Sequence, residues 1–358
     1  MTKLPEGNAI VYCEGAFNTP NGKTANGLVR FTKRYEVLCV IDSCYAGKDA
    51  GLVLDGKENN IPIVADLTQA EKIIKANEKR ATHFVIGLAP DGGRLNCNAK
   101  EDVKKAIRIG LNVDSGLHDF LNEDEEMITL ANQYKVKMRD IRKPPSRNEL
   151  HFFSGKIEEV KSLKVALLGT DSAVGKRTTA WVLVHALQQK GLSAELIGTG
   201  QTAWLQGAKY SLVMDSLVND FVSGEIEHAV HSAWHDLKPD VIVIEGQGSL
   251  MNPAYPGGFE ILAAGRPDIV VLQHSPARKD YDGFPGHPIH PLSRQIEAVE
   301  ILSGKPVVAI TINHENMNKN EITLVCENIE KDHGIPAYDI LTDSSEALVS
   351  TVMKYKNK

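Results

Sequence analysis

One segment combines two glycines, a lysine and hydroxyl residues at a spacing suited to phosphate binding. It runs from Gly169 to Thr178, follows the apolar run Lys164–Leu168 and precedes alanines and leucines at helical spacing. The glycines let the backbone approach a phosphate, the N–H groups and the helix start attract it, and the lysine neutralises it. The predicted phosphate contacts are Gly169, Thr170, Ser172, Ala173, Val174, Gly175, Lys176, Arg177 and Thr178.

This turn departs from the G-x-x-x-x-G-K-[ST] pattern of the common P-loop. Five residues separate Gly169 from Gly175, and Arg177 stands where a hydroxyl residue would bind Mg²⁺, with Thr178 one position later. The departure disfavours metal-assisted nucleotide hydrolysis, because that chemistry depends on the displaced hydroxyl. Arg177 could instead contact a phosphate through two N–H groups, and whether Mg²⁺ binds stays open.

A second apolar run, Val241–Ile244, ends in Glu245 where P-loop domains usually carry an acidic motif. Carboxylates and histidines near such strand ends could accept a proton from a reacting group. The alternative for each carboxylate is a helix cap or a solvated side chain, most of all for Asp215 and Asp220. The candidate catalytic residues are Asp171, Asp215, Asp220, Glu245 and His290.

Cationic, amide and histidine side chains in glycine-rich or proline-rich segments are candidate substrate contacts, because loops after strands often carry function. Arg278 or Lys279 could pair with a substrate carboxylate. The alternative for these segments is turn geometry alone. The predicted substrate contacts are Lys23, His118, Gln201, Gln247, Arg278, Lys279 and His287. No metal site is predicted, since His228, His231 and His235 are better explained as a polar helix face.

Apolar β-branched runs alternate with helical patterns along the whole chain, which predicts βαβ units around parallel sheets. A length of 358 residues favours two domains, and the segment Lys143-Pro-Pro-Ser146 suits a connection between them. We expect an α/β protein of two Rossmann-type three-layer domains. Residues 1–145 form the Rossmann-like domain and residues 146–358 the P-loop NTPase-like domain.

Charge and composition exclude several classes of protein. The net charge is -6, so no overall basic field favours nucleic acid as a partner. No run of about 18 apolar residues and no signal-peptide pattern occur, which disfavours membrane spanning and secretion. The five cysteines form no C-x-x-C pair, as expected for reduced thiols in the cytoplasm. A homodimer is the commonest assembly for such proteins.

Taken together, these segments resemble a family formerly called a domain of unknown function and now associated with D-glutamate N-acetyltransferases. The resemblance covers nearly the whole chain and implies a Rossmann-like N-terminal and a P-loop-like C-terminal domain. It rests on Glu14-Gly-Ala-Phe, Lys23-Thr-Ala-Asn-Gly27, Ile41-Asp-Ser, Ala46-Gly-Lys-Asp-Ala-Gly51, Gly92-Gly93, Ser115-Gly-Leu-His-Asp119, Gly169-Thr-Asp-Ser-Ala-Val-Gly-Lys176, Gly198-Thr-Gly-Gln-Thr202, Glu245-Gly-Gln-Gly-Ser249, Asn252-Pro-Ala-Tyr255 and His287-Pro-Ile-His-Pro291.

The resemblance implies acetyl transfer from acetyl-CoA to the amino group of a D-amino acid, with D-glutamate as the first candidate. CoA fits the phosphate turn, because its diphosphate and 3′-phosphate need amide and cationic donors but no hydrolysis. The turn also resembles that of dethiobiotin synthetase, although Arg177 replaces the threonine of that enzyme. An ATP-dependent ligase or kinase-like enzyme and a non-catalytic nucleotide-binding protein therefore remain the alternatives.

Overall fold

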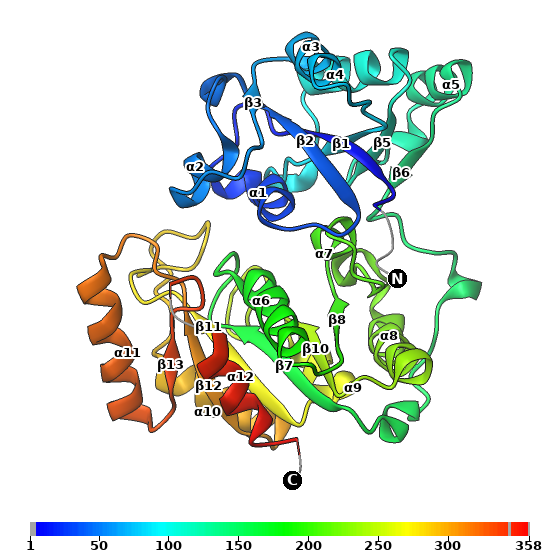
Figure 1. Cartoon of the computed structure of the whole chain (residues 1–358). Helices are drawn as coiled ribbons and strands as arrows, with labels where there is room; N and C mark the ends of the chain where they lie inside the picture. The colour runs from blue at the N-terminus through cyan, green and yellow to red at the C-terminus, as the bar shows by residue number, and fades with distance from the viewer. Residues whose placement is uncertain (1–4, 343–344, 357–358) are drawn as a thin grey trace. The chain divides into compact units, whose positions relative to one another are not determined.

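The protein is represented by a computed structural model that describes residues 5–342 and 345–356 (Figure 1). The chain forms two compact units. The first contains Met1–Pro144 and Gln201–Gly207, and the second contains Pro145–Gly200 and Ala208–Lys358. Both units are built around a parallel sheet, which confirms the α/β class expected from the alternating pattern.

The first unit has a six-stranded sheet in the order β3-β2-β1-β4-β5-β6, the strand order of a Rossmann fold. One apolar cluster lies between the sheet and α3, α4 and α5, and a second includes residues of α1 and α2, so the unit has three layers. Its elements are β1 Gly7–Tyr12, α1 Lys23–Arg30, β2 Tyr35–Ile41, α2 Ala50–Asp55, β3 Ile63–Val64, α3 Leu67–Ala76, β4 His83–Ile86, α4 Cys97–Arg108, β5 Asn112–Ser115, α5 Glu125–Tyr134 and β6 Met138–Asp140.

The second unit has a seven-stranded parallel sheet in the order β13-β12-β11-β7-β10-β8-β9. All residues of its central strands β7 and β10 are buried, as expected for strands covered on both faces. Its elements are β7 Leu163–Gly169, α6 Lys176–Gln189, β8 Ala194–Gly198, β9 Tyr210–Ser211, α8 Asn219–Leu237, β10 Val241–Glu245, α9 Phe259–Gly265, β11 Ile269–His274, α10 Leu292–Ser303, β12 Val307–Ile312, α11 Lys319–His333, β13 Ala337–Tyr338 and α12 Ser345–Met353.

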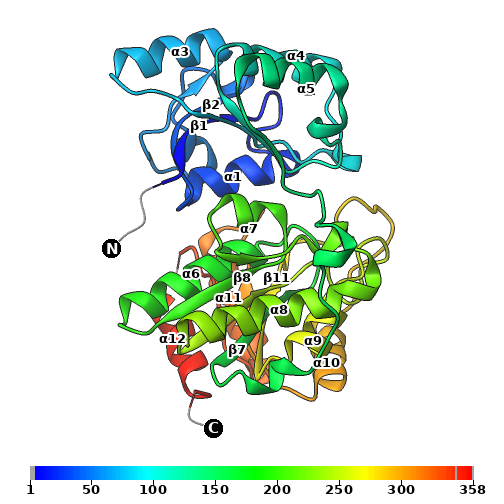
Figure 2. The ribbon, with the colours of Figure 1, turned by 90° about the vertical axis from the view of Figure 1, so that its right-hand side faces the viewer.

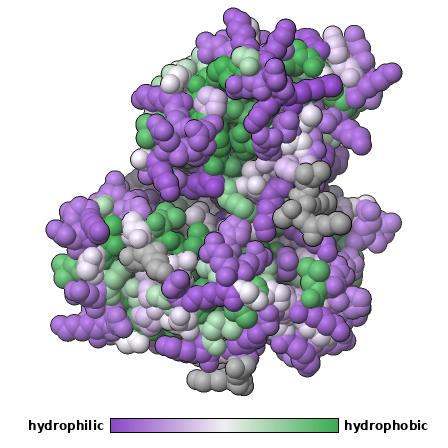
Figure 3. Space-filling model, viewed as in Figure 1, coloured by the Kyte–Doolittle hydropathy of each residue, from purple (hydrophilic) through white to green (hydrophobic). Residues whose placement is uncertain are grey.

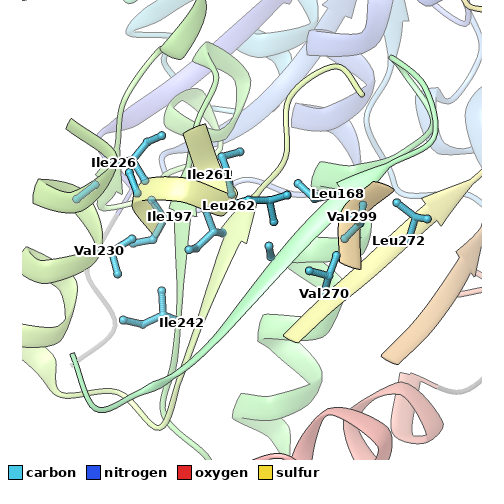
Figure 4. Packing of buried hydrophobic residues seen from close by; sticks show 14 of the residues in the cluster. Leu168, Ile197, Ile226, Val230, Ile242, Ile261, Leu262, Val270, Leu272 and Val299 are labelled. Atoms are coloured by element: carbon cyan, nitrogen blue, oxygen red, sulfur yellow. The ribbon is translucent and has the colours of Figure 1, made fainter. Parts of the chain in front are cut away.

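Helices cover both faces of the second sheet. Figure 2 shows α6 and α12 on one side of it and α8, α9 and α10 on the other. Figure 4 shows how Ile226 of α8, Ile261 of α9 and Val299 of α10 pack with the strand residues Leu168 and Val270 in one buried cluster. This core fixes the positions of the strand ends, where the predicted site residues lie.

The helix α7, Gln201–Leu205, departs from the predicted division of the chain at residue 145. It and the two residues that follow belong to the first unit, although they come from the sequence expected in the second domain. The side-chain amide of Gln206 donates to the carbonyl oxygen of Gly27 over 2.8 Å, and the guanidinium of Arg34 lies 3.6 Å from the ring centre of Trp204. These contacts explain why α7 packs with the Rossmann-like unit.

The surface agrees with a folded chain whose apolar side chains are mostly buried. In Figure 3, hydrophilic side chains predominate on the face shown, with hydrophobic ones in smaller groups between them. Within the described residues, no helix combines the length and the apolar character needed to cross a membrane.

Candidate functional site

The predicted phosphate turn lies between β7 and α6, and its backbone is shaped for an anion. Lys176 is the first residue of α6, and the preceding Gly175 caps the helix without a side-chain hydrogen bond. Ala173 and Gly175 have φ angles of 51° and 106°, in the left-handed region. The cap residue thus offers no side-chain hydrogen bond to the start of this 14-residue helix, and the helix dipole makes this end attractive to a negative charge.

Lys176 bridges the turn and the loop after β10. Its Nζ donates to the carbonyl oxygens of Asp171 and Gly248, each over 2.7 Å. Its aliphatic chain lies against Gly169, where an added Cβ would come within 2.8 Å of the lysine Cδ. Glycine at position 169 thus leaves room for the lysine to fold back over the turn.

Asp171 is fully buried, and its two carboxylate oxygens accept four hydrogen bonds. Oδ1 accepts from the N–H of Ser172 over 2.7 Å and from Nδ2 of Asn252 over 2.8 Å. Oδ2 accepts from Nη1 of Arg278 and from the N–H of Asp282, each over 2.8 Å. A carboxylate with four donors around it is suited to organising the loops beside it more than to the proton transfer expected from the sequence.

Arg278 connects the phosphate turn to the loop after β12. Its Nη1 also donates to the carbonyl oxygen of Ser172 over 2.8 Å, and its Nε donates to Glu315 over 2.8 Å. Burial lowers the pKa of this guanidinium, but the bonds to Glu315 and Asp171 outweigh burial and leave the pKa raised. The side chain predicted to bind a substrate carboxylate therefore already pairs with two carboxylates of the chain.

Glu245 and Gln247 meet around Thr199 at the end of β8. The buried carboxylate of Glu245 accepts from the N–H of Thr199 over 3.0 Å, and Gln247 donates to the hydroxyl of Thr199 over 2.9 Å. Burial raises the pKa of Glu245, while Arg177 is the largest influence in the opposite direction. The charges of Arg177 and Lys176 in the phosphate turn thus act on the carboxyl group of Glu245.

The carboxyl end of β11 contributes two polar residues, Gln273 and His274, that the sequence analysis did not single out. The hydroxyl of Thr170 lies 2.9 Å from Nδ1 of His274, and Oε1 of Gln273 accepts from the hydroxyls of Thr179 and Thr311. Burial lowers the pKa of His274 to about 4, helped by His333, so the ring is neutral near pH 7. Polar side chains at the end of an otherwise apolar strand were the sequence feature that could have predicted Gln273 and His274 as site residues.

The loop after β11 folds into a hairpin and carries four of the predicted residues, Arg278, Lys279, His287 and His290. Its two sides are joined by bonds from the N–H of Ile289 to the carbonyl of Lys279 and from that of Tyr281 to His287. Lys279 and His287 are exposed, and His290 is half-buried. Nδ1 of His290 lies 2.9 Å from the hydroxyl of Tyr281, whose pKa is raised by burial.

Asp215 and Asp220 lie on the exposed segment around the start of α8. Asp215 belongs to the short turn Met214–Ser216, and Asp220 lies in the first turn of the helix, where a carboxylate complements the helix dipole. Both side chains are exposed, and the cap positions of the two segments are Val213 and Val218, so the solvated-carboxylate alternative considered from the sequence fits them better than capping.

The remaining predicted contacts belong to the first unit. Lys23 is exposed at the start of α1, and His118 is exposed with its ring against Gly93. Gln201 is buried against Gly116, where an added Cβ would lie 2.6 Å from its Cγ. Lys23, His118 and Gln201 are thus in one unit, whereas the phosphate turn and the other predicted contacts are in the second.

The first unit also holds a cavity of about 260 Å³ near the carboxyl ends of β1, β2 and β3. Its lining includes Glu14, Asp66 and Asp102, with the hydroxyl of Tyr12 bonded to Asp102 over 3.0 Å. Three carboxyl groups in one cavity would repel an anionic ligand. This cavity is therefore unsuited to a phosphate or a dicarboxylate.

A histidine–aspartate pair also lies at the carboxyl edge of the second sheet. Nδ1 of His314 is 2.6 Å from Oδ2 of Asp339, and the aspartate is fully buried. His314 follows β12 and Asp339 follows β13, which pair in parallel. The sequence analysis missed both residues, because 25 positions separate them and only the adjacent strand ends bring them together.

The strand order and the phosphate turn define this chain as a Rossmann-like domain joined to a P-loop domain. Residues 43–144 match the model described as Domain of unknown function (DUF1611_N) Rossmann-like domain. Residues 151–349 match the model described as Domain of unknown function (DUF1611_C) P-loop domain. The chain belongs to the DUF1611 family, which confirms the resemblance seen in its motifs.

Two curated relatives and one solved structure cover most of the chain. The D-glutamate N-acetyltransferase of Pseudoalteromonas sp. is 29% identical over 306 residues, which are 82% of this chain and 88% of the relative. That of Tritonibacter scottomollicae is 26% identical over 286 residues, 78% of this chain and 83% of the relative. A crystal structure of a DUF1611 family protein from Anabaena variabilis has a TM-score of 0.89 and 25% identity, covering 97% of this chain and 99% of that one.

Proposed function

We propose that this chain is an N-acetyltransferase that moves the acetyl group of acetyl-CoA to the amino group of D-glutamate. The observation that carries the proposal is the phosphate turn, with Lys176 held over it and an arginine in place of the metal-binding hydroxyl. Two relatives named D-glutamate N-acetyltransferase support the reaction and the substrate.

The residues of the turn fit the diphosphate of CoA. The N–H groups at the start of α6, where the cap residue is Gly175, provide donors, and Lys176 provides a positive charge. Arg177 adds a second cation next to it, suited to bidentate contact with a phosphate. Since none of these donors is a metal ligand, we expect acetyl-CoA to bind without Mg²⁺.

The carboxylates of glutamate need cationic partners. Lys279 is exposed on the hairpin after β11, next to Arg278, which anchors this hairpin to the phosphate turn. A flexible lysine on an anchored loop can reach a carboxylate without giving up an existing ion pair. We therefore assign substrate carboxylate binding to Lys279 and the positioning of its loop to Arg278.

The test is release of free CoA thiol from acetyl-CoA, measured with D-glutamate and with L-glutamate in parallel. We expect release with D-glutamate and little with L-glutamate. Absence of thiol release with either enantiomer would refute the proposal, and release of phosphate from ATP with Mg²⁺ would support the ligase or kinase alternative instead.

The phosphate turn is tested separately by the affinity for acetyl-CoA, measured by titration calorimetry. Lys176→Ala should weaken binding by about tenfold or more, since hydrogen bonds to charged groups contribute about 1.5–3 kcal/mol. The matched control is Lys190→Ala at the other end of α6, which should bind as the parent does. Equal affinity of the Lys176 variant and the parent for acetyl-CoA would show that CoA does not bind at the phosphate turn.

A further inference from the structure

The pair formed by His314 and Asp339 has the geometry of a general base. In the tautomer whose Nδ1–H donates to the carboxylate, the lone pair of Nε2 is left to accept another proton. The aspartate is fully buried, whereas 34% of the histidine side chain is exposed. A ligand can thus approach the imidazole while the carboxylate stays behind it.

The loop that carries His314 is held in place from several sides. The N–H of Asn313 donates to the carbonyl of His274 at the end of β11 over 2.7 Å. On the other side of the histidine, Glu315 accepts from Arg278, which itself bonds to the phosphate turn at Asp171. These contacts fix the imidazole and the phosphate turn on one rigid edge of the sheet, as preorganised catalysis requires.

The strand order sets the separation between this pair and the phosphate turn. Only β11 lies between β7 and β12, and Gly169, Gln273 and Thr311 are neighbours across the three strands. Two spacings between neighbouring strands give a separation of about 10 Å. The phosphate turn and the loop of His314 begin directly beyond this row, at the same edge of the sheet.

The pantetheine arm of CoA can bridge this separation. The arm spans on the order of 16 to 18 Å between the diphosphate and the thioester when fully extended, given ordinary bond lengths, and less when it bends. A base whose charge is influenced by Arg177 and Lys176 of the turn, such as Glu245, would lie closer to the diphosphate than to the reacting carbonyl. A base two strands away lies within the reach of a bent pantetheine arm.

We propose that His314 is the general base of acetyl transfer and that Asp339 positions its ring; this rests on the function proposed above. As the neutral amine attacks the thioester carbon, the C–N bond forms and Nε2 of His314 takes the proton from the amine. The C–S bond then breaks, and the imidazolium returns that proton to the leaving sulfur, giving CoA thiol. The proton lost earlier, when the substrate ammonium becomes a neutral amine, passes to water.

The test combines variants of His314 with a kinetic and a binding measurement on the full chain. His314→Gln should lower kcat by about 100-fold or more, the usual contribution of a general base, with the affinity for acetyl-CoA and the Tm close to those of the parent. The matched control is His235→Gln on the exposed face of α8, which should keep the parent rate. Added imidazole should restore part of the rate of His314→Ala.

Asp339→Asn tests the positioning role through separate measurements of kcat and KM. Without the carboxylate, Nδ1 of His314 loses the acceptor that orients the ring, so kcat should fall while the KM for acetyl-CoA stays close to that of the parent. A rise in KM together with a fall in Tm would show a purely structural role and would overturn the role of Asp339.

The outcomes separate this inference from the proposed function. A parent protein that releases thiol while His314→Gln does so at the parent rate would overturn the inference and leave the acetyltransferase proposal standing. A parent that releases no thiol with D-glutamate would overturn both. Loss of rate in His314→Gln with rescue of His314→Ala by imidazole would support both.

Discussion

Replacing Asp171 by asparagine separates an organising role from a catalytic one. The carboxylate is fully buried and accepts from four donors, one of them the guanidinium of Arg278. An asparagine keeps one acceptor oxygen and brings an NH₂ group against donors, and the guanidinium loses its buried partner. Breaking a buried ion pair by removing one partner costs about 3–5 kcal/mol.

Arg278 is 15% exposed and keeps its bond to Glu315, so the lower end of that range, about 3 kcal/mol, applies. For a unit of this size, about 3 kcal/mol corresponds to a decrease in Tm of roughly 6–12 °C. The assay is thermal unfolding followed by calorimetry, in parallel with thiol release. Asp220→Asn, at an exposed position in the first turn of α8, is the control and should lower the Tm much less.

The two roles give different results for Asp171→Asn. An organising carboxylate predicts a large loss of stability together with a loss of acetyl-CoA affinity, because the turn is no longer held. A variant with the parent Tm and the parent affinity that has nevertheless lost its rate would refute this reasoning and restore Asp171 as a proton acceptor.

Two further predictions concern the second unit. The pKa of His274 is about 4 in the fold and about 6.5 in an unfolded chain, so the unfolded state binds more protons between these values. The contribution of His274 to stability is therefore fully present above pH 6.5, and it declines by up to roughly 3 kcal/mol as the pH falls towards 4. Denaturant titrations should show this decline in the parent and less of it in His274→Gln. Equal declines in the two proteins would contradict the prediction. Gly224→Ala should lower the Tm, although alanine normally favours a helix, because the added Cβ would come within 1.9 Å of the carbonyl oxygen of His151. Gly265→Ala in α9, whose Cβ would meet the side chain of Ile244 at 3.1 Å, is the milder comparison, and an unchanged Tm in Gly224→Ala would contradict the packing of this segment on α8.

The sequence predicted best what is local along the chain. The phosphate turn occupies consecutive positions after an apolar strand, so its glycines and Lys176 could be located directly. The α/β alternation and the start of the second strand-rich region near residue 163 were equally local signals. The reaction itself came from the resemblance to a family, because the turn alone fits any phosphate-bearing ligand.

The contacts that give the candidate site its chemistry are not local. Asp171 meets Asn252, Arg278 and Asp282 at separations of 81, 107 and 111 residues, so the sequence could not show that its oxygens are all engaged. The pairing of His314 with Asp339 depends on two strands that lie side by side only after folding. No pattern of spacing in one sequence reports such neighbours.

Because α7 belongs to the first unit, the chain crosses between the two units more than once. The chain passes between them at 144/145, 200/201 and 207/208, so three peptide connections join them where a simple tandem of domains has one. A fragment that ends at the linker would lack Trp204, whose ring lies under the guanidinium of Arg34. A fragment ending at residue 144 would therefore lack part of the packing of its own unit.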